Sequence, residues 1–300
     1  MTAERVLVTG ASGFLGTSLM AKLRATGVPA VGVSRRTPAC AENDAAWRTC
    51  DLLEPGAVDR LFEETRPSVV FHLASEVRGT RDLSAVLPTL RANLESAVEV
   101  LTAAARASCR RVVLAASLEE LPLDQPARFP YAIAKRAATE YGRFFQSVYG
   151  LPVVSARIGM AYVPGQRDAS KLVPHVILSQ LEGRAPRLAS GSRQADWIYV
   201  DDVADALLAC MTSVDLEDTV VDIGTGLATS VGEVADRLTV LTGGPAPEKG
   251  ALLDRRLDLA VLADTERAAR VIGWRAKCDL DEGLRRTVAW YRKEHAAGRV

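Results

Sequence analysis

The chain has 300 residues, of which 48% are hydrophobic, and its 37 basic residues are balanced by 37 acidic ones. This length and composition are enough for one large α/β domain, or for a large and a small one. A net charge of zero does not favour a nucleic-acid partner, because proteins that bind nucleic acids usually carry a basic excess or patch. We expect no membrane segment, since no apolar run is long enough to cross a bilayer and the chain opens on a strand rather than a signal peptide.

The cysteines lie far apart and lack the paired spacing that binds zinc. Only three histidines accompany them, so we expect no metal site. We interpret the cysteines as reduced thiols, which are typical of a cytoplasmic protein. They are Cys40, Cys50, Cys109, Cys210 and Cys278.

Short apolar strands alternate with longer helical stretches, which predicts an α/β fold with a doubly wound parallel sheet of the Rossmann type. After about residue 160, proline and glycine interrupt the pattern, so a smaller, irregular lobe is expected there. We place a dinucleotide-binding domain at 1–165, with further sheet strands from about 195–225, and a substrate lobe mostly within 166–300. The expected strands are Val6–Thr9, Ala30–Val33, Val69–Leu73, Arg111–Ala115, Pro152–Arg157 and Thr219–Ile223.

The first strand runs into a glycine-spaced turn and then a helix expected at Thr17–Ala25. Gly10 allows a tight turn, Gly13 lets the backbone approach a pyrophosphate, and Gly16 permits close packing of the helix on the strand. The N–H groups that open the helix would hold the phosphates. An ordinary tight turn is the alternative, which the flanking strand and helix disfavour. The predicted cradle comprises Gly10, Ser12, Gly13, Phe14, Leu15 and Gly16.

The end of the second strand predicts the type of dinucleotide. A site that prefers NAD usually offers an acidic residue about 20 residues after the glycines, where it binds the ribose 2′-hydroxyl. That place is taken here by Ser34, Arg35 and Arg36, and no Asp or Glu occurs in residues 17–41. Arginine beside serine can hold a 2′-phosphate through charge-assisted hydrogen bonds. We expect NADP(H), with NAD(H) as the alternative if both arginines only belong to a solvated loop.

Two further strand ends should line the same crevice, because ligands of open α/β sheets lie beyond the carboxyl ends of the strands. Asp51 either accepts a hydrogen bond from the adenine amino group or caps the next helix. His72 is expected to be a packed structural residue. The residues assigned to the cofactor at these two ends are Asp51, Leu52, Leu73, Ala74 and Ser75.

Ser117 ends another strand, and Tyr131 follows fourteen residues later at the start of a helix that also carries Lys135. One helical turn separates Tyr131 from Lys135, so both side chains project from the same face. A tyrosine with a pKa of about 10 is a poor base at neutral pH, but a nearby ammonium favours its phenolate. We predict that Ser117 binds a substrate carbonyl while Tyr131 delivers or removes a proton during hydride transfer.

Together these motifs resemble those of the extended short-chain dehydrogenases/reductases, in the branch that modifies nucleotide sugars. The resemblance covers essentially the whole chain and includes Trp197-Ile-Tyr-Val-Asp201-Asp202. It implies that Lys135 also holds the nicotinamide ribose, and that Asn93 belongs to a catalytic water relay with Tyr131 and Lys135. Alternatively, Asn93 only satisfies local backbone groups.

The second half resembles the family's nucleotide-sugar lobe. Tyr162-Val-Pro-Gly-Gln166 is similar to its YGPGQ turn, with valine in place of the first glycine. By this resemblance Lys171, Leu172 and Val173 lie beside the nucleobase, and arginines clamp the diphosphate. Ala195 departs from the many relatives that have arginine at that position, and surface salt bridges are the alternative role of the arginines. The candidates for the clamp are Arg193, Arg255 and Arg256.

The residues after Ser117 bear on the reaction. The family's sugar 4,6-dehydratases carry an acidic or hydroxylated residue directly after the catalytic Ser or Thr, and then a Glu. Here Leu118 comes first and Glu119 second. Leucine cannot donate a proton to a leaving hydroxyl, so dehydration is disfavoured. Glu119 and Glu120 then either contact substrate hydroxyls or lie in solvent.

We therefore predict NADPH-dependent reduction of a keto group on a nucleotide-linked 4-keto-6-deoxyhexose, with dTDP as the expected nucleotide, as in deoxysugar biosynthesis. A nucleotide-sugar 4-epimerase that keeps NAD bound is the alternative. A non-catalytic NADP-binding regulator is disfavoured because Tyr131 and Lys135 are both present.

Two alanine-rich helices are expected at about Leu83–Ala107 and Tyr131–Val148. The resemblance implies that they pair with their copies in a homodimer. Burial against the chain's own sheet is the alternative reason for their apolar character.

Overall fold

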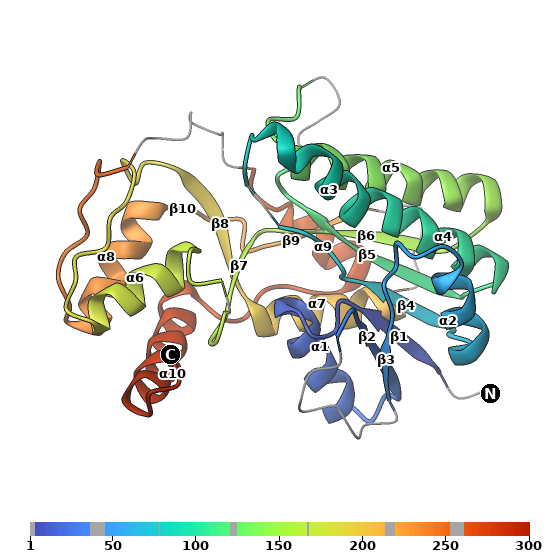
Figure 1. Cartoon of the computed structure of the whole chain (residues 1–300), viewed down its shortest axis with the longest axis horizontal. Helices are drawn as coiled ribbons and strands as arrows, with labels where there is room; N and C mark the ends of the chain where they lie inside the picture. The colour runs from blue at the N-terminus through green and yellow to red at the C-terminus, as the bar shows by residue number, and fades with distance from the viewer. Residues whose placement is uncertain are drawn as a thin grey trace. The chain divides into compact units, whose positions relative to one another are not determined.

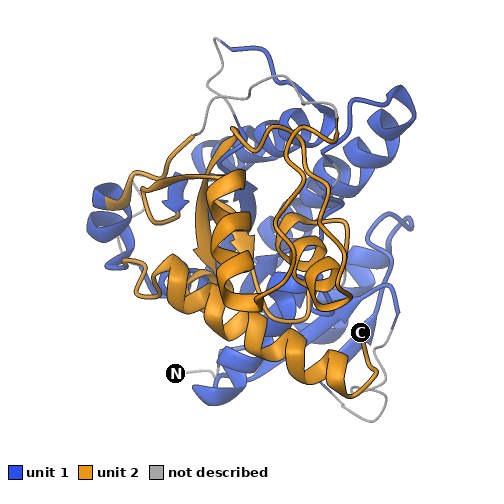
Figure 2. Ribbon diagram, turned by 90° about the vertical axis from the view of Figure 1, so that its left-hand side faces the viewer, with its two compact units in different colours: residues 1–158, 204–223, 266–274 blue, residues 159–203, 224–265, 275–300 orange. Residues whose placement is uncertain are grey.

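The computed structural model describes residues 4–36, 46–77, 79–120, 125–166, 168–213, 220–252 and 261–300. The chain forms two compact units that alternate along the sequence (Figure 2). Unit 1 comprises Met1–Ile158, Ala204–Ile223 and Glu266–Trp274, and unit 2 comprises Gly159–Val203, Gly224–Thr265 and Arg275–Val300. The chain thus leaves unit 1 shortly before residue 165 and returns to it twice.

The sheet of unit 1 has seven parallel strands among the described residues, in the order β3-β2-β1-β4-β5-β6-β9 (Figure 1). The order reverses direction between β1 and β4, which confirms the predicted doubly wound sheet. Every residue of β1, β4 and β5 is buried, as expected for central strands covered on both faces. The strands are β1 Val6–Thr9, β2 Ala30–Ser34, β3 Trp47–Thr49, β4 Val69–His72, β5 Arg111–Ser117, β6 Val153–Ile158 and β9 Val220–Ile223.

Helices cover both faces of this sheet. Helices α2, α4 and α5 pack side by side on one face, whereas α1 and α7 lie on the other (Figure 1). A salt bridge between Lys22 and Asp205 links α1 to α7. The core beneath α4 and α5 includes Val70, Val112 and Phe145. The helices are α1 Phe14–Ala25, α2 Ala57–Thr65, α4 Ser96–Arg106, α5 Pro130–Tyr149, α7 Val200–Thr212 and α9 Thr265–Ile272.

The helix predicted over residues 83–107 is not continuous. It begins as a 3-10 turn at Leu83–Ala85, continues as α3 over Val86–Leu90, and opens into a π-helical turn at Arg91–Glu95 before α4. A π-helical turn bonds each N–H to the carbonyl five residues back rather than four, and such turns are frequent at functional sites. This one carries Asn93, whose buried side chain binds a neighbouring loop, as described below.

Unit 2 contains a smaller sheet in the order β10-β8-β7. Strand β8 falls in the region predicted to supply strands to the main sheet, but it pairs with β7 and β10 instead. Buried Asp196 on β8 accepts hydrogen bonds from the backbone N–H groups of Thr225, Gly226 and Ala263, which ties three segments of unit 2 together. The elements are β7 Met160–Tyr162, α6 Leu172–Leu181, β8 Gln194–Tyr199, β10 Ala228–Ser230, α8 Val231–Thr242 and α10 Leu280–Ala296.

None of the helices in the described ranges is both long and apolar enough to span a membrane. Within the same ranges, no group of three or more His, Cys, Asp or Glu side chains is arranged to hold a metal ion. Four cysteines are described, and all are free thiols: Cys50, Cys109, Cys210 and Cys278. Cys40 lies outside the described residues.

Candidate active site

The loop after β1 has room only for glycine at its two tightest positions. Gly10 has φ +68°, in the left-handed region, and a Cβ there would lie 2.6 Å from the backbone nitrogen of Ala74. A Cβ on Gly16 would overlap the carbonyl oxygen of Gly10. Both separations are far below van der Waals contact, so any side chain at either position would push the loop away from the strand ends. The observed backbone agrees with the roles predicted for these two glycines.

The start of α1 fits the pyrophosphate of a dinucleotide. Gly13 is the N-cap, and no side chain of the described residues caps the helix there. The first turn also contains no acidic residue. The opening N–H groups and the positive end of the helix dipole therefore favour an anion. Half-buried Ser12, Phe14 and Leu15 surround this position.

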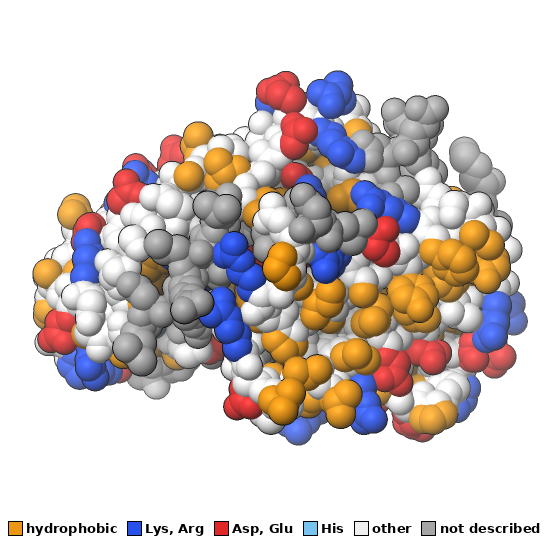
Figure 3. Space-filling view, turned by 90° about the horizontal axis from the view of Figure 1, so that it is seen from above, with side chains coloured by type: hydrophobic (Ala, Val, Ile, Leu, Met, Phe, Trp, Pro, Cys, Tyr) orange, Lys and Arg blue, Asp and Glu red, His pale blue; other side chains and the backbone are white. Residues whose placement is uncertain are grey.

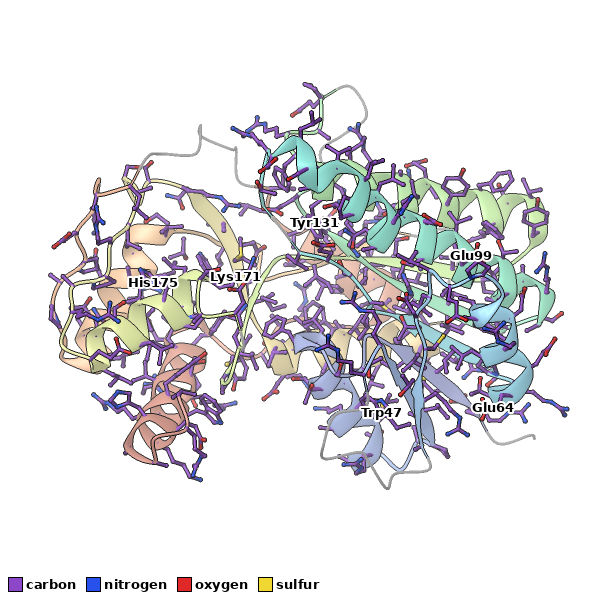
Figure 4. The ribbon with its side chains drawn as sticks, viewed as in Figure 1. Trp47, Glu64, Glu99, Tyr131, Lys171 and His175 are labelled. Atoms are coloured by element: carbon purple, nitrogen blue, oxygen red, sulfur yellow. The ribbon has the colours of Figure 1, made fainter. Side chains whose placement is uncertain are left out.

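The end of β2 departs from the prediction for Ser34. Its hydroxyl donates to the carbonyl of Arg36 at 2.5 Å and accepts from the indole nitrogen of Trp47 at 3.1 Å. Trp47 lies on β3 (Figure 4), and its ring packs against Gly32. A hydroxyl has a single proton, so in this geometry Ser34 has none left to donate to a 2′-phosphate. Of the three residues predicted here, Arg35 and Arg36, whose side chains are exposed, remain as candidate donors.

The other predicted cofactor residues are divided between surface and core. The exposed Asp51 accepts a hydrogen bond from the backbone N–H of Leu53 at 3.0 Å. It therefore caps a turn and not the next helix, whose N-cap is Gly56. Leu52 and Leu73 are buried apolar residues. Ala74 lies against the Gly10 turn, as described above.

His72 is a packed structural residue, as predicted. Its ring is buried between two hydroxyls, with Thr9 Oγ1 2.9 Å from Nδ1 and Ser96 Oγ 3.4 Å from Nε2. Burial lowers the pKa of His72 to about 3, and the charge of Lys135 acts in the same direction. The imidazole is consequently neutral at physiological pH.

Asn93 binds the loop that follows β4. Its side-chain oxygen accepts from the hydroxyl of Ser75 at 2.6 Å and from the N–H of Glu76 at 3.0 Å, and its amide nitrogen donates to the Glu76 carbonyl at 3.0 Å. These bonds support the local role of Asn93, the second of its two predicted roles. The same bonds hold Ser75, which was predicted to contact the cofactor.

The fold brings the three predicted catalytic side chains together. Ser117 is the last residue of β5, and Tyr131 lies in the first turn of α5, directly after Pro130 (Figure 4). Tyr131 forms a hydrogen bond with Ser117. The Lys135 ammonium donates to the carbonyl of Ala115 at 2.7 Å and lies 5.9 Å from the centroid of the Tyr131 ring. All three side chains are buried.

Burial dominates the titration of this site. It raises the pKa of Tyr131, with the charge of Glu119 adding to the effect and the hydrogen bond with Ser117 opposing it. It also lowers the pKa of Lys135 to about 8, which the charge of Glu120 opposes. Burial is the largest of these effects, so in this geometry the net shift in pKa opposes the phenolate that Lys135 was predicted to favour. Tyr131 is a protonated phenol at neutral pH.

Sequence reasoning missed the position of Glu120. This residue was expected at the substrate or in solvent, but it is only 4% exposed. One carboxylate oxygen accepts from the Ser117 N–H at 2.8 Å, and the other from the Thr139 hydroxyl at 2.8 Å. Thr139 lies one helical turn beyond Lys135, so its place on the active-site face of α5 was readable from the sequence. Glu119 is half-buried, and its N–H donates to the Ser117 hydroxyl at 3.2 Å.

The substrate candidates in unit 2 differ in exposure. Lys171 is the N-cap residue of α6 and lies 3.9 Å from the carboxylate of Asp168 (Figure 4). Leu172 is half-buried, whereas Val173 is buried in the core of unit 2. The side chain of Val173 packs in that core, so only its backbone is left to lie beside a nucleobase. Arg193 is half-buried just before β8, and Arg255 and Arg256 lie outside the described residues.

Comparison with known proteins agrees with this geometry. The model of the NAD dependent epimerase/dehydratase family matches residues 6–224. The UDP-glucose 4-epimerase of Mycolicibacterium smegmatis is 29% identical, with 97% of this chain and 99% of that protein covered. The structure of Thermotoga maritima UDP-glucose 4-epimerase with UDP-glucose has a TM-score of 0.88 at 26% identity, covering 97% of this chain and 99% of that one.

A further solved structure, MoeE5 in complex with UDP-glucuronic acid and NAD, has a TM-score of 0.84 at 32% identity and covers 97% of this chain and 99% of its own. The family match spans most of the chain, including the glycine turn and the Ser117, Tyr131 and Lys135 site. The resemblance predicted from the motifs is thereby confirmed. The chain belongs to the NAD-dependent epimerase/dehydratase family, within the extended short-chain dehydrogenases/reductases.

Proposed function

We propose that this enzyme uses NADPH to reduce the keto group of a nucleotide-linked 4-keto-6-deoxyhexose, with dTDP as the expected nucleotide. The observation that carries the proposal is the pair of exposed arginines, Arg35 and Arg36, at the end of β2. An NAD site usually carries an acidic residue at that strand end, whereas arginine suits a 2′-phosphate. NADPH is the cofactor that a net reductase draws from the cell.

The direction of the pKa shift of Tyr131 supports reduction. When bound, NADPH supplies a hydride to the keto carbon. Ser117 would hydrogen-bond the carbonyl oxygen, and Tyr131 would donate its proton to the alkoxide that forms. The raised pKa of Tyr131 keeps that proton available at neutral pH. Lys135, held by the carbonyl of Ala115, supplies positive charge beside the phenol as the proton leaves.

A nucleotide sugar is the substrate class that the comparisons support, since the solved relatives were obtained with UDP-glucose and with UDP-glucuronic acid. In this chain the nucleotide would lie beside Lys171 and Leu172, and Arg193 would contact the diphosphate. Both arrangements rest on the family resemblance.

The direct test combines cofactor binding with turnover. NADPH and NADH are titrated by fluorescence, dTDP-4-keto-6-deoxyglucose is then added, and nicotinamide absorbance is followed. We expect NADPH to bind more tightly and to be oxidised on addition of the keto sugar. Tightly bound NAD that copurifies, together with interconversion of UDP-glucose and UDP-galactose without a net absorbance change, would overturn the proposal.

The other candidate function is a nucleotide-sugar 4-epimerase, which would copurify with NAD and interconvert UDP-glucose and UDP-galactose. It is favoured by the relatives, which include two UDP-glucose 4-epimerases and a protein solved with NAD. An epimerase starts by oxidising its substrate, so its tyrosine must first accept a proton. Burial of Tyr131 disfavours the phenolate that this step requires.

The arginine pair leads to a prediction on cofactor preference. The double variant Arg35→Ala, Arg36→Ala is expected to raise the Kd for NADPH by about 10- to 100-fold, because hydrogen bonds to charged groups contribute about 1.5–3 kcal/mol. The Kd for NADH should stay unchanged, because NADH lacks the 2′-phosphate. Arg24→Ala, near the end of α1 that is distant from the glycine turn, is the control for loss of positive charge. Equal weakening of NADPH and NADH would contradict a 2′-phosphate site.

We also propose a homodimer formed through α3 and α5. These helices carry exposed apolar side chains, and Figure 3 shows hydrophobic groups gathered over this part of the surface. Leu87→Asp is expected to convert the dimer to monomer in light scattering coupled to size exclusion, because Leu87 is 64% exposed on α3. Val240→Asp, at an 85% exposed residue on α8, should leave the mass unchanged. A monomeric wild-type protein would rule out this surface. The apolar side chains on the two helices are Val86, Leu87, Leu90, Ile133, Tyr141, Phe144, Val148 and Tyr149, and Leu83 precedes α3 in the 3-10 turn.

A further inference from the structure

Glu120 is a buried ionisable group with no role in the chemistry proposed above. It follows β5 and joins two elements of the active site, since one oxygen binds the backbone of Ser117 and the other binds Thr139 on α5. Its own N–H donates to the Ser117 carbonyl at 3.1 Å, which closes a tight turn around the catalytic serine. Both carboxylate oxygens therefore have a donor from a different element.

The face of α5 that Glu120 contacts is the catalytic face. Tyr131, Lys135 and Thr139 follow one another at intervals of one helical turn, so their side chains lie in one row. All three are buried. A bond to Thr139 consequently sets the position of the row along the end of β5, where Ser117 and the carbonyl of Ala115 lie.

The charged neighbours of Glu120 come from two elements. Burial raises the pKa of Glu120, and its hydrogen bonds with Thr139 and Ser117 oppose that shift. The charges of Lys135 on α5 and Arg157 on β6 also favour the ionised form. Arg157 is itself held by Asp222 on β9 at 2.7 Å. In return, the charge of Glu120 raises the pKa of Lys135 and also that of Tyr131.

A buried carboxylate adds little by itself to the stability of a fold. Removing a carboxylate from water costs free energy, and apolar residues of similar size often serve a core as well or better. Here the carboxylate supplies two acceptors in one plane, which a hydroxyl or an apolar side chain cannot do. The geometry is therefore better explained by a role in ordering the site.

We infer that Glu120 is a positioning residue: its carboxylate accepts hydrogen bonds from both the Ser117 N–H and the Thr139 hydroxyl. This pair of hydrogen bonds, which we call the clamp, holds the catalytic serine in position relative to Tyr131 and Lys135. This inference rests on the proposed function for its kinetic consequence only. The clamp itself is a property of the described chain and can be measured without substrate.

The test separates the geometry of the clamp from its charge. Glu120→Gln keeps an acceptor for the Ser117 N–H, and its amide can donate to the Thr139 hydroxyl, but the charge is lost. Thr139→Val keeps the charge of Glu120 but removes the hydroxyl that donates to it, and Thr139→Ser restores that hydroxyl. Glu140→Gln, at the half-buried partner of Arg143 on the same helix, is the matched control. Thermal unfolding checks that each variant is folded.

The readout without substrate is the titration of Lys135 by NMR of the ε carbons in protein labelled with [13C]lysine. The chain has only six lysines, Lys22, Lys135, Lys171, Lys249, Lys277 and Lys293, and a Lys135→Met variant assigns the signal. In the wild type we expect a pKa of about 8. Glu120→Gln should lower it by about 1 unit, because a neighbouring carboxylate favours the ammonium form. Glu140→Gln should leave it unchanged.

The kinetic readout is turnover of whichever nucleotide sugar the wild type accepts. Thr139→Val is expected to reduce kcat by about tenfold or more, with little change in KM, because small displacements of catalytic groups have large effects on rate. Thr139→Ser should recover most of the lost activity. If Glu120 only stabilised the fold, the substitutions Glu120→Gln, Thr139→Val and Thr139→Ser would lower the unfolding temperature without altering kcat or the pKa of Lys135.

The clamp is overturned if Glu120→Gln leaves the pKa of Lys135 unchanged, or if Thr139→Val and Thr139→Ser have the same kcat. Failure of the proposed function looks different. In that case the wild type does not oxidise NADPH with the keto sugar, while the response of Lys135 to Glu120→Gln is still observed.

Discussion

Replacing Tyr131 by phenylalanine is expected to lower kcat for NADPH oxidation by about 10²- to 10⁴-fold, the usual contribution of a positioned acid or base. The substitution removes only the hydroxyl, so the ring keeps its buried place and its stacked neighbour Phe129, 6.4 Å away between centroids. Without the hydroxyl, the proposed proton donor to the alkoxide is lost. The affinity for NADPH, measured by fluorescence, should remain close to that of the wild type.

Tyr141→Phe is the matched control for this experiment. Tyr141 lies on the same helix but is 42% exposed, so loss of its hydroxyl should leave kcat unchanged. Normal turnover in Tyr131→Phe would show that another group donates the proton, and would remove Tyr131 from the mechanism. A parallel loss of NADPH binding would instead indicate a structural defect of the cofactor site.

Replacing Gly10 by alanine is expected to abolish cofactor binding and to destabilise the fold. The new Cβ would lie 2.6 Å from the nitrogen of Ala74, which belongs to the backbone and cannot rotate away. Relief requires the loop after β1 to move off the loop after β4, and the start of α1 would move with it. Overpacking of this kind typically costs about 1–3 kcal/mol of unfolding free energy.

Gly27→Ala provides a control with almost the same backbone. Gly27 has φ +72°, against +68° for Gly10, but nothing lies within 4 Å of its Cβ position. Both variants carry the cost of a left-handed alanine, about 1–2 kcal/mol, so the difference between them measures the steric overlap alone. Denaturant unfolding and NADPH titration of both proteins give that difference. Equal stability and equal NADPH affinity would show that the loop is not packed as described.

Local patterns were enough to predict most strands of the main sheet and the shared helix face of Tyr131 and Lys135. Runs of mainly apolar residues such as Val6–Thr9 and Arg111–Ala115 predict central parallel strands, because such strands are covered on both faces. Helical periodicity likewise places Tyr131 and Lys135 on one face, whatever the rest of the chain does. The glycine turn belongs to the same class, since its requirement for glycine follows from close approach of neighbouring backbone.

Tertiary structure decided the partners of the polar groups. The proton of Ser34 goes to Arg36 because the indole of Trp47, thirteen residues later, occupies the other side of its hydroxyl. The side chain of Asn93, in the π-helical turn, likewise accepts a hydrogen bond from Ser75 in a distant loop. Neither partner is adjacent in the sequence, and a polar side chain offers no periodic signal that would identify it.

The same reason accounts for the electrostatics of the active site. The spacing of Tyr131 and Lys135 suggested that the ammonium would favour the phenolate, yet burial raises the pKa of Tyr131. Desolvation depends on how many segments close over a group, which only the assembled fold determines. Glu120 shows the same limit, because its burial follows from the meeting of β5 and α5 and not from its neighbours in the chain. Sequence alone thus determined which elements form and which residues share a face, and the packing of distant segments determined protonation and hydrogen bonding within the site.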